Sequence, residues 1–145
     1  MARFQVYILG CGSALPNLKH NTSSQVVEVH DKLFMVDCGE GTQLQLRKSR
    51  IHFSKINGIF ISHLHGDHCF GLIGMLSSFG LLGRTMPLAI YAPKEFKPVL
   101  DMMLKTFCYD FDYEIQFHAV DTKKRAVIYE DRSLTVESIP LKHRE

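Results

Sequence analysis

The chain is organised around Ile59-Phe60-Ile61-Ser62-His63-Leu64-His65-Gly66-Asp67-His68, where an apolar run that predicts a buried strand leads directly into three histidines and an aspartate. On an extended segment, His63 and His65 point to the same side. Gly66 is expected to let the backbone turn, so that Asp67 and His68 enter from another direction. Neutral imidazole nitrogens with a carboxylate oxygen are typical of hydrolytic zinc sites, which keep one position open for water. The stretch therefore predicts a metal site.

Length and composition indicate one globular domain. With 145 residues, of which 46% are hydrophobic and 22% charged, the chain can bury a sizeable core. A net charge of +2 is too small to indicate a nucleic-acid partner by itself. No apolar stretch reaches the roughly 18 residues of a membrane span, and the N-terminus carries no signal-peptide pattern, so we expect a cytoplasmic protein that does not enter a membrane. The four cysteines are widely spaced and predict neither a disulfide framework nor a zinc knuckle.

Three strands and a helix are expected before the histidine-rich stretch. Alternating β-branched and aromatic residues predict strands over residues 4–9, 25–30 and 33–36, the last two forming a hairpin. Residues 43–50 favour a helix and end in cations, which suits a helix C-terminus. Together these segments predict the beginning of a sheet with a covering helix.

A polar loop separates the first two of these strands. It could place Lys19, His20 and backbone amides beside a phosphate. A plain surface loop explains its composition equally well.

After the histidine-rich stretch, apolar residues follow a helical spacing over residues 67–80, so the first turn of this helix would contain metal ligands. A short strand over 87–91 and a second amphipathic helix over 96–107 come next. Three strands in succession then suggest a meander, over residues 113–120, 126–129 and 134–139. The expected fold class is α/β, a mixed sheet with covering helices.

The pattern His63-x-His65-x-Asp67-His68 resembles the HxHxDH signature of the metallo-β-lactamase superfamily. The resemblance implies an αβ/βα sandwich that holds one or two metal ions at its edge. It also implies that Asp37, at the end of a predicted strand, supports the metal loop from behind and orients its ligands. From the residues alone, Asp37 is equally well a turn or cap aspartate.

Within the superfamily the chain is similar to the ribonuclease Z family, the endonucleases that trim 3′ trailers from precursor tRNA. Four stretches carry the resemblance: residues 9–16 with the Lys19-His20-Asn21 loop, residues 37–43, residues 61–68, and Pro140-Leu141-Lys142-His143. The loop would contact the substrate backbone through Lys19, His20 and Asn21. It departs from the family pattern at His20, where arginine is more usual.

The ribonuclease Z resemblance also implies two zinc ions in the complete active site. His63, His65 and His143 would bind the first zinc, and Asp67 and His68 the second. A terminal histidine such as His143 would otherwise be read as a solvent-exposed residue. A hydroxide shared by the two ions would attack the phosphodiester, leaving a tRNA 3′-hydroxyl and a 5′-phosphorylated trailer. Asp67 would also act as a catalytic residue that orients the hydroxide and accepts its proton.

The family's remaining zinc ligands, its proton donor and its tRNA-gripping arm lie beyond the position of His143. We therefore expect residues 1–145 to be the N-terminal αβ half of a metallo-β-lactamase domain, with the C-terminal half absent. Alone, this half is expected to be inactive and to expose an apolar sheet face, which would favour a homodimer.

Two other functions remain compatible with the residues. An arylsulfatase-like enzyme or a small-molecule phosphodiesterase of the same superfamily could use the same metals. A non-catalytic zinc-binding interaction module belongs to a different class. For the module, metal removal would unfold the protein rather than only stop hydrolysis.

Overall fold

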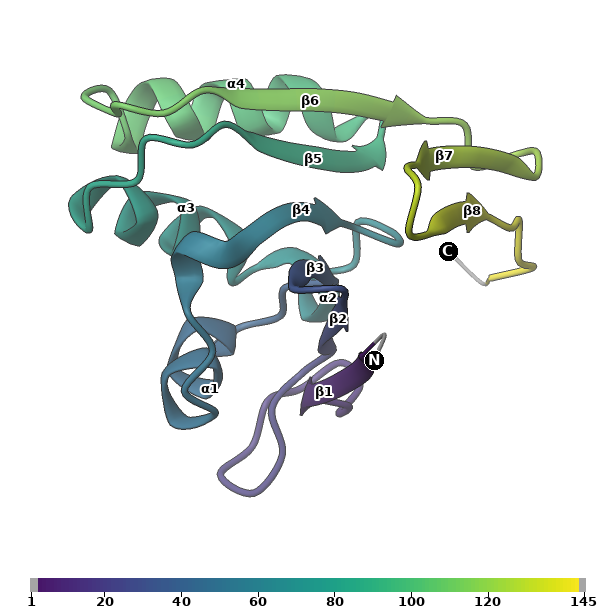
Figure 1. Cartoon of the computed structure of the whole chain (residues 1–145), viewed down its shortest axis with the longest axis horizontal. Coiled ribbons are helices and arrows are strands. Elements are labelled where there is room, and N and C mark those ends of the chain that lie inside the picture. The colour runs from purple at the N-terminus through teal and green to yellow at the C-terminus, as the bar shows by residue number, and fades with distance from the viewer. Residues whose placement is uncertain (1–2, 144–145) are drawn as a thin grey trace.

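A six-stranded mixed sheet forms the centre of the computed structural model, which describes residues 3–143 (Figure 1). Its strands lie in chain order, and they are β1 (Phe4–Gly10), β2 (Ser24–Val29), β3 (Lys32–Val36), β4 (Ile56–Phe60), β5 (Leu88–Pro93) and β6 (Ile115–Val120). The first three pair antiparallel, and β3 to β6 pair parallel. Parallel strands place their carboxyl ends at one edge of the sheet, and the histidine-rich stretch follows β4 at that edge.

Residues His30 and Asp31 join β2 to β3 in a two-residue turn. Both have positive φ, 47° and 66°, as the tight hairpin turns that match strand twist require. Val29 then pairs with Lys32, and Val27 with Phe34. This register confirms the hairpin predicted from the alternating residues.

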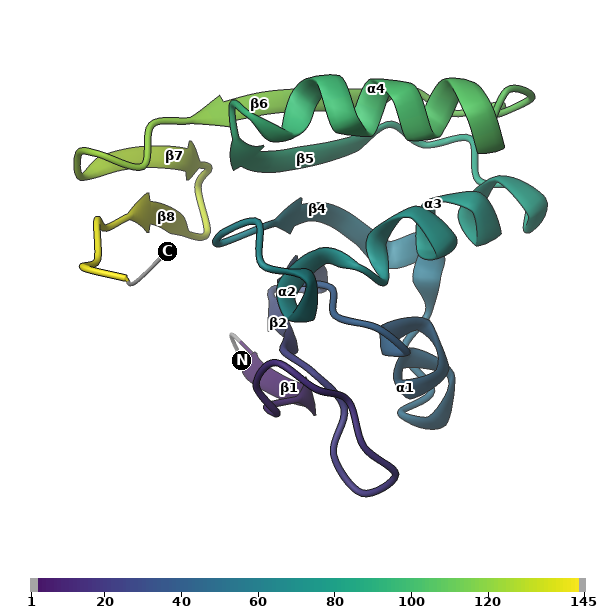
Figure 2. The ribbon, with the colours of Figure 1, turned by 180° about the vertical axis from the view of Figure 1, so that it is seen from behind.

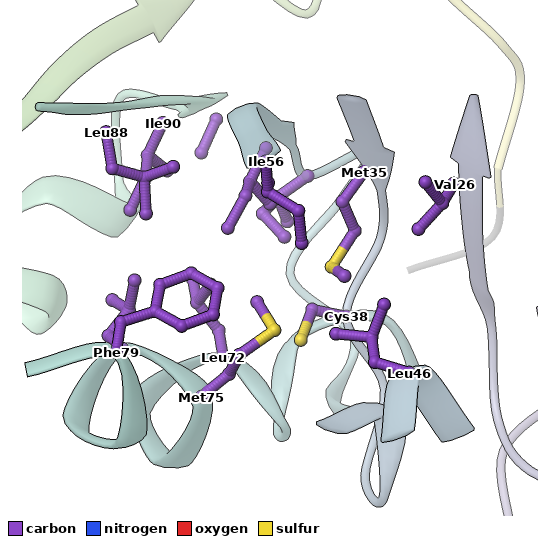
Figure 3. Packing of buried hydrophobic residues seen from close by; sticks show 14 of the residues in the cluster. Val26, Met35, Cys38, Leu46, Ile56, Leu72, Met75, Phe79, Leu88 and Ile90 are labelled. Atoms are coloured by element: carbon purple, nitrogen blue, oxygen red, sulfur yellow. The ribbon is translucent and has the colours of Figure 1, made fainter. Parts of the chain in front are cut away.

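Three helices cover one face of the sheet, as Figures 1 and 2 show together. They are α1 (Thr42–Lys48), α3 (Leu72–Leu81) and α4 (Phe96–Phe107), and a single 3-10 turn, η1 (Phe53–Lys55), precedes β4. Figure 3 shows strand side chains such as Met35 and Ile56 packed against Leu46, Met75 and Phe79 of the helices. Burial of these apolar side chains is the main force that holds helices and sheet together. Within the described residues, no helix is long and apolar enough to cross a membrane.

A separate hairpin covers part of the opposite face of the sheet. Strands β7 (Ala126–Glu130) and β8 (Thr135–Ser138) pair only with each other, so the predicted three-strand meander is wrong. The first of the three strands, β6, extends the main sheet parallel to β5 instead, because α4 returns the chain to the edge where β5 began.

The hairpin also limits the extent of the apolar sheet face that was expected to be exposed. Phe34, Phe60 and Tyr91 lie on that face and are buried, since side chains of β7 and β8 pack over them. The face remains open at β1, where Phe4, Val6 and Ile8 are 71%, 47% and 62% exposed. The expected exposure is therefore confined to one end of the sheet.

Two helices replace the single helix predicted over residues 67–80. Helix α2 (Gly66–Cys69) carries Asp67 and His68, and α3 begins after Gly71. Gly71 donates its N–H to the carbonyl of Cys38, and a β-carbon at Gly71 would collide with the carbonyl of Gly39. The close approach of the turn after β3 interrupts the helix, a tertiary contact that residue spacing does not reveal.

Alanine substitutions at two glycines of this region are predicted to have opposite effects on stability. Gly71→Ala is expected to lower the free energy of unfolding by about 1–3 kcal/mol, because its methyl group would push against backbone. Gly74→Ala, inside α3, would meet only Gln43 Nε2 at 3.5 Å and is expected to raise stability by up to about 1 kcal/mol. Urea unfolding of both variants measures the difference, and equal stabilities would contradict the close-approach explanation.

Candidate metal centre

Three histidines from two distant segments converge beside the end of β4. His63 and His65 lie in the loop between β4 and α2, and His143 belongs to the segment after β8. Figures 1 and 2 show that β8 lies at the same end of the molecule as the loop that follows β4. One ring nitrogen from each of the three lies within 4.8 Å of the others. The structure thus brings together the three residues predicted to bind the first zinc.

The His63 ring lies at the centre of this group. Its centroid is 4.7 Å from that of His65, 4.8 Å from that of His143 and 3.9 Å from that of His68. Its Nε2 atom is buried and makes no hydrogen bond to any described residue. A buried polar atom normally has a partner, so this nitrogen fits a metal ligand whose partner is the ion.

Burial and the neighbouring histidines keep His63 uncharged. Burial is the largest cause that lowers its pKa, and the rings of His68, His65 and His143 lower it further. A lowered pKa leaves the lone pair of the imidazole free at neutral pH, which metal binding requires. The electrostatics of the centre therefore agree with its geometry.

Asp37 fixes the orientation of His68. The Asp37 carboxylate lies 2.6 Å from His68 Nδ1, and an acceptor at this position favours a proton on that nitrogen. The other ring nitrogen, Nε2, lies 3.4 Å from Asp67 Oδ2. A carboxylate behind a histidine is the usual arrangement around zinc, where it sets the tautomer and the ring orientation.

Asp37 also holds the loop that carries the histidines. Its Oδ1 accepts the N–H of Ser62 at 2.7 Å, and its Oδ2 accepts the Ser62 hydroxyl at 2.8 Å. Asp37 is 4% exposed and has a φ of 61°, a left-handed conformation that aspartate tolerates. These contacts place Asp37 behind the metal loop, in the position implied by the resemblance.

Ser62 is a member of the site that sequence reasoning missed. Its hydroxyl lies 2.8 Å from Asp37 Oδ2 and 3.1 Å from His63 Nδ1, so it lies between the supporting carboxylate and a central ligand. The sequence feature that could have identified Ser62 is its position directly before His63 in the motif. A hydroxyl next to a ligand can orient it through a hydrogen bond.

Asp67 lies beside His68 and is hydrogen-bonded to the loop after β1. Its Oδ2 accepts the backbone N–H of Ala14 at 2.9 Å, and this bond is the main reason why the pKa of Asp67 is lowered. Asp67 is therefore a carboxylate at neutral pH. Asp67 and His68, the pair predicted for a second zinc, lie next to each other and next to His63.

Gly66 plays a different role from the one predicted. It is the first residue of α2 and is absent from the glycines with positive φ, so the turn does not depend on its conformational freedom. The Phe70 ring instead occupies the space that a β-carbon at Gly66 would need. Gly66 thus permits close packing within α2.

The three predicted substrate-binding residues divide into two kinds. Lys19 and His20 are exposed, and their backbone N–H groups donate to Asn17 Oδ1. Asn21 instead accepts a hydrogen bond from Gln45 of α1 at 2.6 Å, so its side chain oxygen is used within the fold. Lys19 and His20 are therefore the exposed members of the three, and Asn21 is partly buried.

Curated bacterial proteins named Ribonuclease Z are similar to nearly the whole chain. The one from Bacteroides fragilis is 60% identical over 144 residues, which is 99% of this chain and 47% of that protein. The proteins from Bacteroides thetaiotaomicron and Porphyromonas gingivalis are 56% and 51% identical. The chain spans about half the length of these relatives, and the resemblance to ribonuclease Z is confirmed.

Solved structures agree with this resemblance. The short form of human tRNase Z has a TM-score of 0.80 and 28% identity, covering 91% of this chain and 58% of that one. The metallo-β-lactamase fold protein YhfI from Bacillus subtilis has a TM-score of 0.62 at 22% identity, over 83% of this chain and 46% of that one, and supports the fold alone. The predicted fold class is confirmed.

One protein-family model covers residues 4–145 and is described as Anti-Pycsar protein Apyc1. It includes every residue of the centre, from Ala14 to His143. The chain, which has the metallo-β-lactamase fold, therefore belongs to the family described as Anti-Pycsar protein Apyc1.

Proposed function

We propose that the intact protein containing this chain is a zinc-dependent endoribonuclease that removes 3′ trailers from precursor tRNA. The products would be a tRNA 3′-hydroxyl and a 5′-phosphorylated trailer. The observation that carries the proposal is the convergence of His63, His65 and His143, in a chain whose relatives are named Ribonuclease Z. We also propose a cytoplasmic location, where precursor tRNA is found and where unpaired cysteines such as Cys11 and Cys69 stay reduced.

In this proposal, His63, His65 and His143 hold one zinc ion, and Asp67 and His68 supply ligands to a second. Bound zinc would supply Lewis acidity that lowers the pKa of water and neutralises the phosphodiester oxygens. The chain's own residues orient this chemistry. Asp37 keeps the proton of His68 on Nδ1, and the ionised Asp67 carboxylate can accept a proton from the attacking water.

The exposed side chains of Lys19 and His20 are proposed to meet the RNA backbone. Both extend from the loop between β1 and β2, and Ala14 of the same loop is bound to Asp67. A cation near the reacting phosphate would contribute mainly to binding and positioning of the substrate. Asn21 would act indirectly, because its bond to Gln45 anchors this loop to α1.

We further propose that residues 1–145 supply the N-terminal half of the active protein and do not process precursor tRNA alone. Two residues of this chain, Asp67 and His68, are assigned to the second zinc, and the chain spans about half the length of its relatives. The exposed Phe4, Val6 and Ile8 on β1 support a proposed association into a homodimer, since exposed apolar patches are typical of interfaces.

Cleavage of a precursor tRNA with a 3′ trailer tests the proposed function. The intact protein is expected to release a trailer with a 5′-phosphate, to lose activity on chelation and to regain it when zinc is restored, whereas the 145-residue chain is expected to be inactive. Bis-p-nitrophenyl phosphate serves as the small phosphodiester for comparison. Cleavage of this ester without processing of precursor tRNA would favour the small-molecule hydrolase, and unfolding on chelation without any hydrolysis would favour the non-catalytic module.

A further inference from the structure

A polar contact between residues far apart in the sequence attaches the β7–β8 hairpin to the main sheet. Asp131 follows β7, and its Oδ2 lies 2.6 Å from the ammonium of Lys32 at the start of β3. The same oxygen accepts the hydroxyl of Tyr129 at 2.6 Å. We call Lys32, Tyr129 and Asp131 the clasp.

Asp131 is also the residue that shapes the hairpin turn. Its Oδ1 accepts the N–H groups of Ser133 and Leu134 and the Ser133 hydroxyl. The bond from Lys32 is the largest of the causes that hold the pKa of Asp131 well below its usual range. Burial and the neighbouring carboxylate raise the pKa of Tyr129 to about 12, so Tyr129 keeps the proton that it donates.

The Tyr129 ring joins this polar contact to the apolar packing beneath the hairpin. Its centroid lies 5.1 Å from that of Phe34 and 6.5 Å from that of Phe60, both of which are buried. Tilted and edge-on aromatic contacts at these distances are favourable and directional. The position of the hairpin on the sheet is therefore set by charge and by ring packing at the same point.

The hairpin leads directly to the third histidine of the metal centre. β8 ends at Ser138, and His143 lies five residues beyond it. Residues 139–143 form neither helix nor strand, and Ile139 and Leu141 are exposed. Since five residues reach at most about 18 Å, a shift of the hairpin moves the point from which His143 must approach His63 and His65.

We propose that the clasp is a positioning device for the metal centre, which holds His143 within binding distance of His63 and His65 by fixing the β7–β8 hairpin to β3. The inference rests on the proposed function, because it requires that these histidines bind zinc. Lys32, Tyr129 and Asp131 act through His143 and do not touch the ion or the substrate.

Zinc affinity of the intact protein, measured by competition with a chromophoric chelator, tests the clasp. Asp131→Asn keeps a carbonyl oxygen for the turn but removes the negative charge that pairs with Lys32. It is expected to weaken zinc binding about tenfold, the smallest effect typical of residues that support metal ligands without binding the metal. In a protein that already carries His143→Ala, the same substitution is expected to cause no further loss. Cobalt bound in place of zinc should show absorption bands shifted toward those of His143→Ala.

Two further variants complete the experiment. Lys32→Met removes the other charge from a residue that is partly exposed, and it should weaken zinc binding to a similar extent without altering the hairpin turn. Asp101→Asn serves as the matched control. It removes the carboxylate that forms an exposed ion pair of 2.8 Å with Lys97 on α4, and zinc affinity is expected not to change.

Three results would overturn the clasp. Unchanged zinc affinity in Asp131→Asn and Lys32→Met, while His143→Ala weakens binding, would refute the clasp and leave the proposed metal centre intact. An equal loss with and without His143 would show general destabilisation. No effect of His143→Ala itself would refute both the clasp and the metal centre on which the proposed function depends.

Discussion

Replacing His63 with alanine is expected to reduce trailer cleavage by the intact protein more than about 100-fold, because even outer residues of metal sites contribute 10–100-fold. His63 lies between His65, His68 and His143, and its buried Nε2 has no described hydrogen-bond partner. Cleavage of a precursor tRNA under single-turnover conditions, with zinc in excess, measures the loss.

His52→Ala is the matched control for this substitution. His52 is an exposed histidine that precedes η1 and makes no side-chain cap bond, so its removal should leave cleavage unchanged. If His63→Ala retained cleavage within tenfold of the unsubstituted protein under the same conditions, His63 would not be a zinc ligand and the proposed centre would be wrong.

Asp37→Asn is expected to lower zinc affinity by about 10–100-fold, because the amide no longer holds the His68 proton on Nδ1 as a carboxylate does. The same substitution should lower the free energy of unfolding by about 1–3 kcal/mol, since Asp37 accepts both the N–H and the hydroxyl of Ser62 in a buried position. Chelator competition and urea unfolding measure the two effects separately.

Asp121→Asn provides the comparison for Asp37. Asp121 is an exposed turn aspartate whose carboxylate accepts the backbone N–H of Lys123, and it lies outside the metal centre. Its substitution should change stability by less than about 0.5 kcal/mol and zinc affinity not at all. A loss of stability in Asp37→Asn with unchanged zinc affinity would show that Asp37 is only a turn residue, the alternative that its sequence position left open.

The parts of the fold that local pattern determines were predictable. Alternating residues predicted β1 and the β2–β3 hairpin, and apolar spacing predicted α4 over the range where it is found. The division between α2 and α3 was missed because it depends on the approach of Gly39 to Gly71, which are far apart in the sequence. The meander was wrong for a related reason: periodicity identifies strands such as β6 but does not say which strands pair.

The residues of the candidate centre also differ in whether local sequence pattern predicts them. The histidines of the loop were evident from their spacing, whereas His143 was assigned only through the resemblance to a family. The bonds that hold Asp67 and Asp37 involve the backbone of Ala14 and the side chain of Ser62. Every residue except proline has a backbone N–H, so sequence patterns do not identify a particular one as part of a site.

The bond between Ala14 and Asp67 couples the N-terminal loop to the metal centre. A single carboxylate oxygen, Oδ2, accepts the Ala14 N–H and also lies 3.4 Å from His68 Nε2. Ala14 belongs to the same loop as Lys19 and His20. A ligand that binds this loop and alters its conformation would therefore alter how strongly the Asp67 oxygen binds an ion. Because such coupling is reciprocal, an ion bound at Asp67 would change the affinity of the loop for its ligand by the same factor. In the proposed enzyme, contact of this loop with an RNA backbone and occupancy of the second zinc position would therefore be linked equilibria, coupled through the hydrogen bond between Ala14 and Asp67.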